Sequence, residues 1–191
     1  RLSPQTQTHI NEAGCIAAND LQQGAARTGK APSAAYWNLC GAVFAYLYAG
    51  LAEQGIDVLG ASQLVGYPTQ FPSVTLLQWP SGAPNARYRV LQLLHESFGP
   101  GDRMVKAALQ SPDVYAAAYL SAQGERRILL INKRAAPVEL VVSNAKGARE
   151  QHVDVDSADS QPEAQILTSD TVHLGGFSVM VIRLTQANIS R

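Results

Sequence analysis

The chain has 191 residues, enough to bury a sizeable core in one large domain or two small ones. Its 15 lysines and arginines balance its 15 aspartates and glutamates, so no net charge favours binding to nucleic acid or to an anionic membrane. No run of 18 apolar residues lacks polar breaks, and we therefore expect no membrane partner. The histidines and cysteines lack metal-site spacing and no nucleotide-binding motif is present, so we expect neither metal nor cofactor.

The first predicted strand is a short extended run at 7–10, followed by Asn11, Glu12 and Gly14. It lies so close to Arg1 that we expect the chain to begin partway through a domain. In α/β enzymes, catalytic carboxylates commonly follow a strand, because the strand fixes the backbone while the loop beyond it stays open to substrate. Glu12 is therefore a candidate catalytic residue.

A loop is expected at 19–32, with Asp20 solvated. Ser33 then predicts the start of a helix over 34–54, and a strand candidate follows at 56–65. Helical spacing predicts the following buried face for this helix: Tyr36, Leu39, Cys40, Val43, Leu47, Gly50 and Leu51. An apolar run at 74–79 precedes a second helix over 86–98, which Asn85 caps.

From residue 102 the apolar pattern changes to short runs separated by turn signals. The six main strand candidates are 104–109, 114–121, 127–132, 138–143, 150–155 and 177–184, and 172–174 is a seventh. Such a series without helices is typical of an antiparallel β-sandwich. We expect Val114, Leu130, Val141 and Val181 in its core. The chain thus divides into an α/β part, residues 1–100, and an all-β part, residues 101–191.

Cys15 and Cys40 have neither zinc-site nor redox-motif spacing. They form either a disulfide or two buried thiols, and we expect the thiols.

Five segments together resemble the last part of a clan A retaining glycoside hydrolase barrel. They are Ile10-Asn11-Glu12-Ala13-Gly14, Tyr36-Trp37-Asn38, Gly60-Ala61-Ser62-Gln63-Leu64-Val65-Gly66-Tyr67-Pro68, Pro72-Ser73-Val74-Thr75-Leu76-Leu77-Gln78-Trp79 and Asn85-Ala86-Arg87-Tyr88-Arg89-Val90-Leu91-Gln92-Leu93-Leu94. The β part is similar to the domain beside the barrel in family 39 and family 51 enzymes, family 39 above all. The resemblance implies barrel strands 7 and 8 with their helices in 1–100, followed by a β-sandwich.

The resemblance also implies that Glu12 ends the seventh barrel strand, where this clan keeps its nucleophile. The preceding Asn11 is more typical of the acid/base position, which leaves that role as the alternative. The acid/base carboxyl of the clan lies on the fourth strand, which this chain lacks. Gln63 and Tyr67 either contact the sugar or stabilise the loop, and we include Asn11 and Trp37 among the substrate-binding candidates.

The function that follows is hydrolysis of glycosidic bonds, with a carbohydrate as substrate. The alternative is a non-catalytic carbohydrate-binding or interaction module derived from such an enzyme. Two barrel strands cannot close a sheet, so we expect a homo-oligomer or a second chain that supplies the missing strands. We expect a secreted or periplasmic location rather than a cytoplasmic one.

Overall fold

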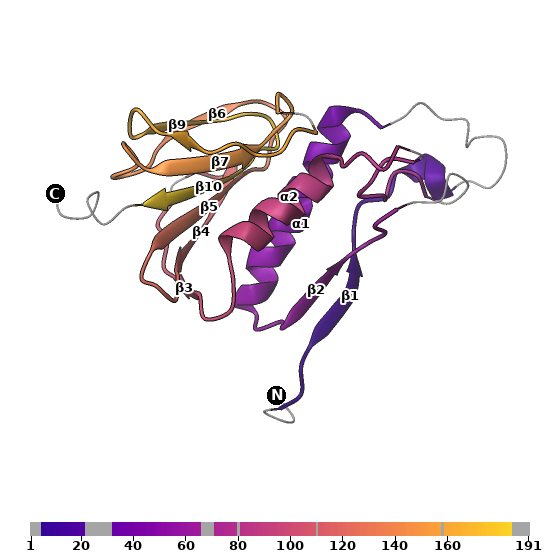
Figure 1. Ribbon diagram of the computed structural model, residues 1–191, viewed down its shortest axis with the longest axis horizontal. Helices are drawn as coiled ribbons and strands as arrows, with labels where there is room; N and C mark the ends of the chain where they lie inside the picture. Colours follow the sequence, from indigo (N-terminus) through magenta and orange to yellow (C-terminus); the bar gives the residue numbers. More distant parts are fainter. Residues whose placement is uncertain are drawn as a thin grey trace.

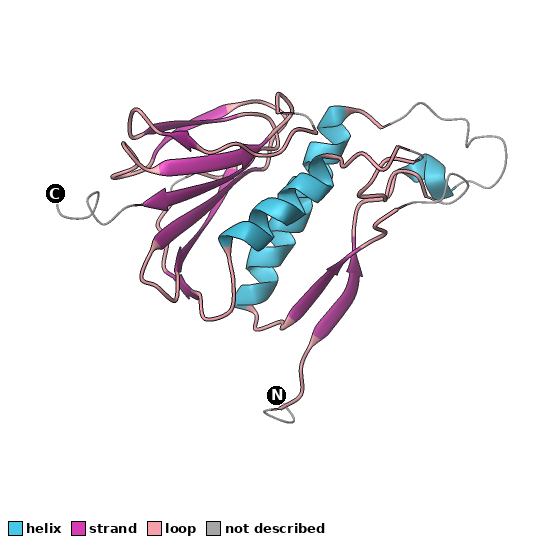
Figure 2. Ribbon diagram, in the orientation of Figure 1, coloured by secondary structure: helices cyan, strands magenta, loops and turns pink. Residues whose placement is uncertain are grey.

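The computed structural model describes residues 5–21, 32–65, 71–79, 81–109, 111–157 and 159–184, without the side chains of residues 19 and 21. Three layers follow one another (Figure 1). A parallel pair of strands, β1 (His9–Ala13) and β2 (Val58–Ala61), forms the first layer. The helices α1 (Ala34–Glu53) and α2 (Ala86–Ser97) form the second, and antiparallel sheets form the third (Figure 2).

Both helices begin where their capping residues predict. The Ser33 hydroxyl accepts the backbone N–H of Tyr36 at 3.3 Å, and the Asn85 side chain accepts the N–H groups of Arg87 and Tyr88. These bonds satisfy amide groups that the first turn of a helix leaves without a partner. The predicted helix at 34–54 is confirmed with its end at Glu53, and the one at 86–98 with its end at Ser97.

The buried face of α1 differs from the prediction. Leu39 is 37% exposed, Val43 40% and Tyr46 47%, whereas Ala45 and Ala49 are fully buried. A Cβ added at the nearby Gly41 would lie 2.8 Å from a methyl group of Val90 on α2. The two helices therefore approach each other closely at a small residue. Three large apolar side chains of α1, Leu39, Val43 and Tyr46, stay partly exposed, while Trp37 and Phe44 are buried.

The antiparallel part contains one six-stranded sheet and one two-stranded sheet. The order in the larger sheet is β3-β4-β5-β10-β7-β8, and β6 pairs with β9. The strands are β3 (Arg103–Val105), β4 (Val114–Leu120), β5 (Arg126–Asn132), β6 (Val138–Val141), β7 (Arg149–Val153), β8 (Gln165–Ile166), β9 (Thr171–Leu174) and β10 (Val179–Leu184). Six predicted strands and the seventh candidate each have a counterpart, while the run at 74–79 forms only isolated bridges and β8 was not predicted.

Side chains alternate between two core clusters along the strands of the larger sheet. Leu129 and Ile131 belong to the cluster that packs against the helices, whereas Leu130 belongs to a second cluster shared with β9. The first cluster contains residues from both sides of residue 100, so the two predicted domains share a core. Their boundary stays a prediction.

Three of the four predicted core valines and leucines are buried, but Val141 is 74% exposed. Its neighbour Val142 is 8% exposed and packs in the second cluster instead. The prediction was wrong by one residue, and in a strand such a shift exchanges the two faces.

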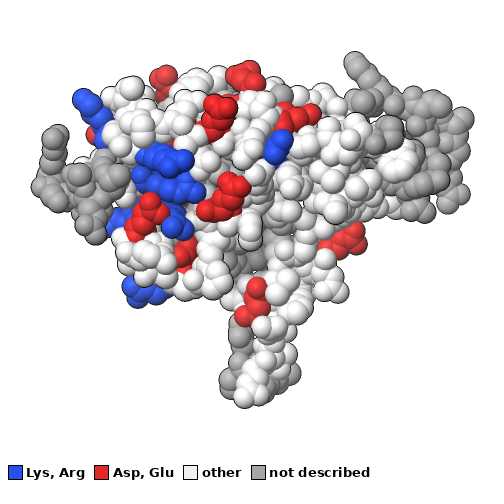
Figure 3. All heavy atoms as spheres, in the orientation of Figure 1, with Lys and Arg blue, Asp and Glu red and all other residues white. Residues whose placement is uncertain are grey.

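The face drawn in Figure 3 carries lysines and arginines over the antiparallel sheets, interspersed with acidic residues. Neither sign dominates a large part of this face. Among the described residues no helix has the length and apolar character needed to cross a membrane.

Candidate active site

Glu12 lies in an irregularity near the carboxyl end of β1. Ile10 pairs with Leu59 and Ala13 with Ala61, so Asn11 and Glu12 together face the single residue Gly60. Two residues opposite one is the arrangement of a β-bulge, which bends a strand and redirects its side chains. The strand therefore runs past the predicted 7–10 and includes Glu12, whose side chain is exposed.

Gly60 is the residue that permits this arrangement. A Cβ at position 60 would lie 2.2 Å from the carbonyl oxygen of Asn11, closer than atoms can approach. The backbone of β1 at the bulge thus occupies the space that a side chain on β2 would need. The position of Glu12 depends on the absence of a side chain at residue 60.

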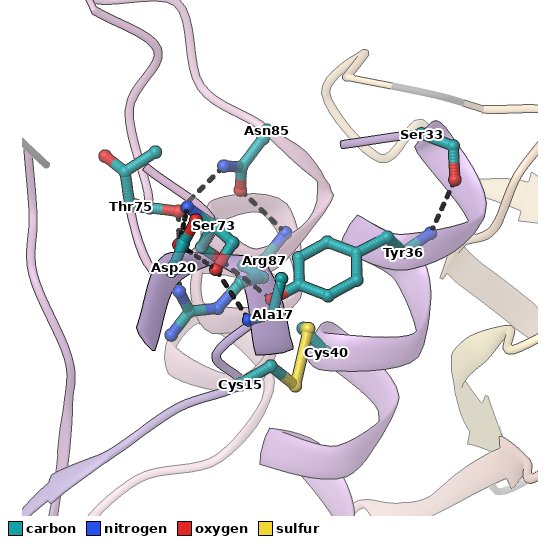
Figure 4. Close-up of a disulfide and its surroundings, with 10 residues drawn as sticks. All are labelled: Cys15, Ala17, Asp20, Ser33, Tyr36, Cys40, Ser73, Thr75, Asn85 and Arg87. Carbon is teal, nitrogen blue, oxygen red and sulfur yellow. Dashed lines mark hydrogen bonds between the residues drawn. A yellow bond between two sulfur atoms is a disulfide. The ribbon is translucent and has the colours of Figure 1, made fainter. Parts of the chain in front are cut away.

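The segment after β1 is joined to α1 by a disulfide between Cys15 and Cys40 (Figure 4). Their Cα atoms are 5.5 Å apart, a usual separation for this bond. The expectation of two buried thiols was wrong, because the fold brings the turn after β1 against the second turn of α1. The disulfide fixes the loop that begins two residues after Glu12.

Asp20 and Ser73 form a buried polar contact that also holds this loop. The carboxylate of Asp20 accepts the Ser73 backbone N–H at 2.8 Å and the Ser73 hydroxyl. The same hydroxyl accepts the N–H of Ala17, while the Ser73 carbonyl accepts the Tyr36 hydroxyl at 3.0 Å (Figure 4). Asp20 is 7% exposed, so the expectation of a solvated aspartate was wrong. Burial raises the pKa of Tyr36, which keeps its hydroxyl a donor.

Arg87 lies beneath the carboxyl ends of both parallel strands. It is 3% exposed, and its Nη1 donates to the carbonyl of Thr75 at 3.4 Å. Its Nη2 has no hydrogen-bond partner among the described residues and lies 2.9 Å from where Gly14 would place a Cβ. Desolvation lowers the pKa of Arg87, because burial disfavours the charged form. A buried cation with one free nitrogen thus faces the strand ends.

The other predicted site residues lie at different depths. Asn11 is exposed beside Glu12 in the bulge. Gln63 follows β2 with a φ of 44°, and its side-chain oxygen is buried without a partner among the described residues. Trp37 is 4% exposed and packs edge-on against Tyr36 in the helix-facing core, so we leave it out of the proposed site. Tyr67 lies outside the described residues.

Glu12 makes no hydrogen bond or ion pair with another described side chain, which leaves its carboxylate open to a ligand. A carboxylate in this state can attack an electrophilic carbon or accept a proton. Retaining glycoside hydrolysis needs a second carboxyl about 5 Å away. Within the described part of the chain, no three histidine, cysteine or acidic side chains are grouped so as to hold a metal ion.

No protein-family model and no curated protein matches the chain. Solved glycoside hydrolases do resemble its structure. A family 30 endoxylanase from Clostridium papyrosolvens matches with a TM-score of 0.60 at 15% identity over 94% of this chain and 42% of its own. A family 86 β-porphyranase from Bacteroides plebeius gives 0.59 at 12% identity over 94% and 35%. A family 51 arabinofuranosidase from Xanthomonas axonopodis pv. citri gives 0.57 at 16% identity over 94% and 41%.

The chain therefore has the fold of part of a glycoside hydrolase barrel protein, and it spans about two fifths of the first matched structures. At these identities the likeness defines the fold alone. It agrees with the expected clan, while the closer resemblance to family 39 stays a prediction.

Proposed function

We propose that this chain forms the carboxyl-terminal part of a retaining glycosidase, with Glu12 as the nucleophile. The observation that carries the proposal is the bulge, which holds an exposed carboxylate near the carboxyl end of a parallel strand. Carboxyl ends of parallel strands are where barrel enzymes bind substrate. The likeness to glycoside hydrolases supports the same reading.

In this mechanism the Glu12 carboxylate attacks the anomeric carbon and forms a glycosyl ester, while the leaving oxygen takes a proton from a second carboxyl. Water then cleaves the ester with the second carboxyl as base. The disulfide and the contact between Asp20 and Ser73 limit movement of the loop behind Glu12. Asn11 and Gln63 are the described side chains that we assign to sugar hydroxyl groups.

We further propose that a chain carrying the remaining barrel strands covers β1 and β2. Within the described residues these strands pair only with each other, and parallel sheets are normally buried on both faces. Val58 is 42% exposed, Leu64 58% and Val65 45%, all on this side of the helices. The Nη2 of Arg87 also lacks an acceptor within the part of the chain that the structure describes. Association with a second copy is the competing form of this proposal. The antiparallel part is then the β-sandwich beside the barrel.

The disulfide supports a secreted or periplasmic location, since such bonds persist in oxidising compartments.

The test is a panel of dinitrophenyl glycosides, whose leaving group departs without protonation and so makes the missing acid unnecessary. We expect slow release of dinitrophenolate by the wild-type chain and a loss of about a thousandfold or more in Glu12→Gln. Glu163→Gln, a change at an exposed acid on the antiparallel part, should keep the wild-type rate. Equal rates for wild type and Glu12→Gln would refute the assignment. Oligosaccharide binding without any turnover would favour the non-catalytic module instead.

A further inference from the structure

A hollow lies at the opposite end of the helices from Glu12. It has a volume of about 540 Å³ and is lined by Tyr48, Ala52, Glu53, Phe98, Gly99, Asp102, Met104 and Tyr119. Because α1 runs back to the start of β2, its last turn lies at the amino ends of the parallel strands, near β3 (Figure 1). The cavity is thus separate from the candidate active site.

Aromatic rings form the floor of this cavity. The rings of Phe98 and Tyr119 have centroids 4.4 Å apart, and Tyr48 lies 6.2 Å from Phe98. Phe98 and Tyr119 are buried, whereas Ala52 and Glu53 at the rim are exposed. A ligand would enter beside Glu53 and lie against Tyr48, which is only half-buried, and the π face of an aromatic ring carries partial negative charge.

The electrostatic environment of the cavity is negative. The C-terminal end of α1 lines it, and a helix C-terminus carries about half a negative charge. The last carbonyl groups of α2 accept hydrogen bonds from Arg127 and Arg183 and add little. Glu53 adds a full charge at the rim, while Asp102 is balanced by Arg127 at 3.2 Å. No lysine or arginine is among the described residues that line the cavity. Burial raises the pKa of Tyr48, and the charge of Asp102 adds to this shift.

The Tyr119 hydroxyl is the polar group in this cavity that lacks a partner. Tyr119 is 4% exposed, and its oxygen makes no hydrogen bond with any described residue. A buried hydroxyl without a hydrogen-bond partner destabilises a fold, and most buried hydroxyl groups in native structures have a partner. The neighbouring Tyr115 hydroxyl already donates to Glu53 at 3.1 Å. An N–H donor in the cavity would give the Tyr119 oxygen the bond that it lacks.

We infer that this cavity binds a small organic cation, a protonated amine, between the aromatic floor and Glu53. The charge of Glu53 and the aromatic rings favour a cation over a neutral molecule, and an N–H group of that cation can also bond to the Tyr119 oxygen. The inference stands apart from the proposed glycosidase, because it uses no residue of the candidate active site.

The test is a titration of the full chain with cyclohexylammonium and with its neutral counterpart cyclohexanol. Binding is monitored by amide chemical shifts and by calorimetry. We expect the cation to bind in the millimolar range and shift the amides of Gly99, Asp102 and Tyr119, with cyclohexanol at least about tenfold weaker. Equal binding of the two, or no binding of either, would overturn the inference. Glucose is titrated in the same way. Glucose binding as tight as that of cyclohexylammonium would identify a neutral saccharide site and would also overturn the inference.

Two variants locate the site without disturbing the fold. Glu53→Gln keeps an acceptor for Tyr115 but removes the charge, and should weaken cyclohexylammonium binding about tenfold. Glu96→Gln, the matched change on the last turn of α2 outside the cavity, should leave binding unchanged. Tyr119→Phe removes only the unpartnered hydroxyl and should also weaken binding. Wild-type affinity in both Glu53→Gln and Tyr119→Phe would place the cation elsewhere and contradict the inference.

Discussion

The carbonyl oxygen of Asn11 occupies the space in which any residue other than glycine at position 60 would place its Cβ, with 2.2 Å between the two positions. This contact couples β2 to the bulge that carries Glu12. Catalytic geometry tolerates errors of only about half an ångström. A methyl group on one strand should therefore disturb a carboxylate on the other.

Gly60→Ala should destabilise the chain by about 2 kcal/mol or more, because backbone must move to admit the methyl group. It should also abolish any activity that depends on Glu12. The matched control is Gly50→Ala in α1, where a Cβ meets nothing within 4 Å and a better helix former replaces glycine. Urea unfolding measures the stability of both variants. Equal stability of Gly60→Ala and wild type would show that the bulge adapts.

Removal of the disulfide between Cys15 and Cys40 should lower the free energy of unfolding by about 3 kcal/mol, as expected for a loop of this length. Unfolding in urea with and without reductant tests this. The double variant Cys15→Ala/Cys40→Ala should unfold like the reduced wild type and show no response to reductant. Two titratable thiols in the untreated native chain would contradict the pairing.

Val142→Ala should cost about 1 to 3 kcal/mol, since it leaves a cavity in the cluster between the two antiparallel sheets. Val141→Ala should change stability by less than about 0.5 kcal/mol, because Val141 is 74% exposed. Thermal or urea unfolding compares the two adjacent changes. A larger loss of stability in Val141→Ala than in Val142→Ala would show that Val141 is the core residue.

Local signals predicted the elements well, because they act over a few residues. Ser33 and Asn85 cap their own helices, so both helix starts followed from the sequence. The buried face of α1 did not follow. Leu39 and Val43 recur at helical spacing but stay partly exposed, because the close approach at Gly41 places small residues of α1 against α2. Which face a helix buries depends on its partner, and the sequence of one helix does not contain that information.

The candidate site was predicted only in part, for a similar reason. The position of Glu12 after an extended run was a local signal, but its bulge depends on Gly60 in another strand. Asp20 and Ser73 are 53 residues apart, and no spacing rule links them. The disulfide closes a shorter distance of 25 residues, yet two cysteines outside any motif fit a pair of thiols equally well.

His152 should make the stability of the chain depend on pH. Its Nδ1 lies 3.0 Å from the buried carboxylate of Glu150, and its Nε2 lies 3.8 Å from Asp154. The hydrogen bond to Glu150 raises the pKa of His152, against the opposing effect of burial. The stabilisation is thus fully present below the unfolded value of about 6.5 and is lost as pH rises through the higher folded value.

Unfolding free energies measured from about pH 6 upward, for wild type and His152→Asn, isolate this contribution as their difference. We expect the advantage of the wild type to be largest at the acid end and to shrink as the imidazolium loses its proton. A difference that stays constant, or that grows with pH, would mean that the contact with Glu150 does not favour the charged ring.

The central claim is that Glu12 becomes covalently bound to a sugar. Dinitrophenyl 2-deoxy-2-fluoroglycosides test it most directly, because the fluorine slows breakdown of the glycosyl ester and the leaving group needs no acid. Intact mass followed by peptide mapping reads the result. The account predicts one added fluoroglycosyl group, on the peptide that contains Glu12, and none in Glu12→Gln. Labelling of another carboxylate would contradict it. So would the absence of labelling by the fluoro derivative of a glycoside that the wild-type chain hydrolyses.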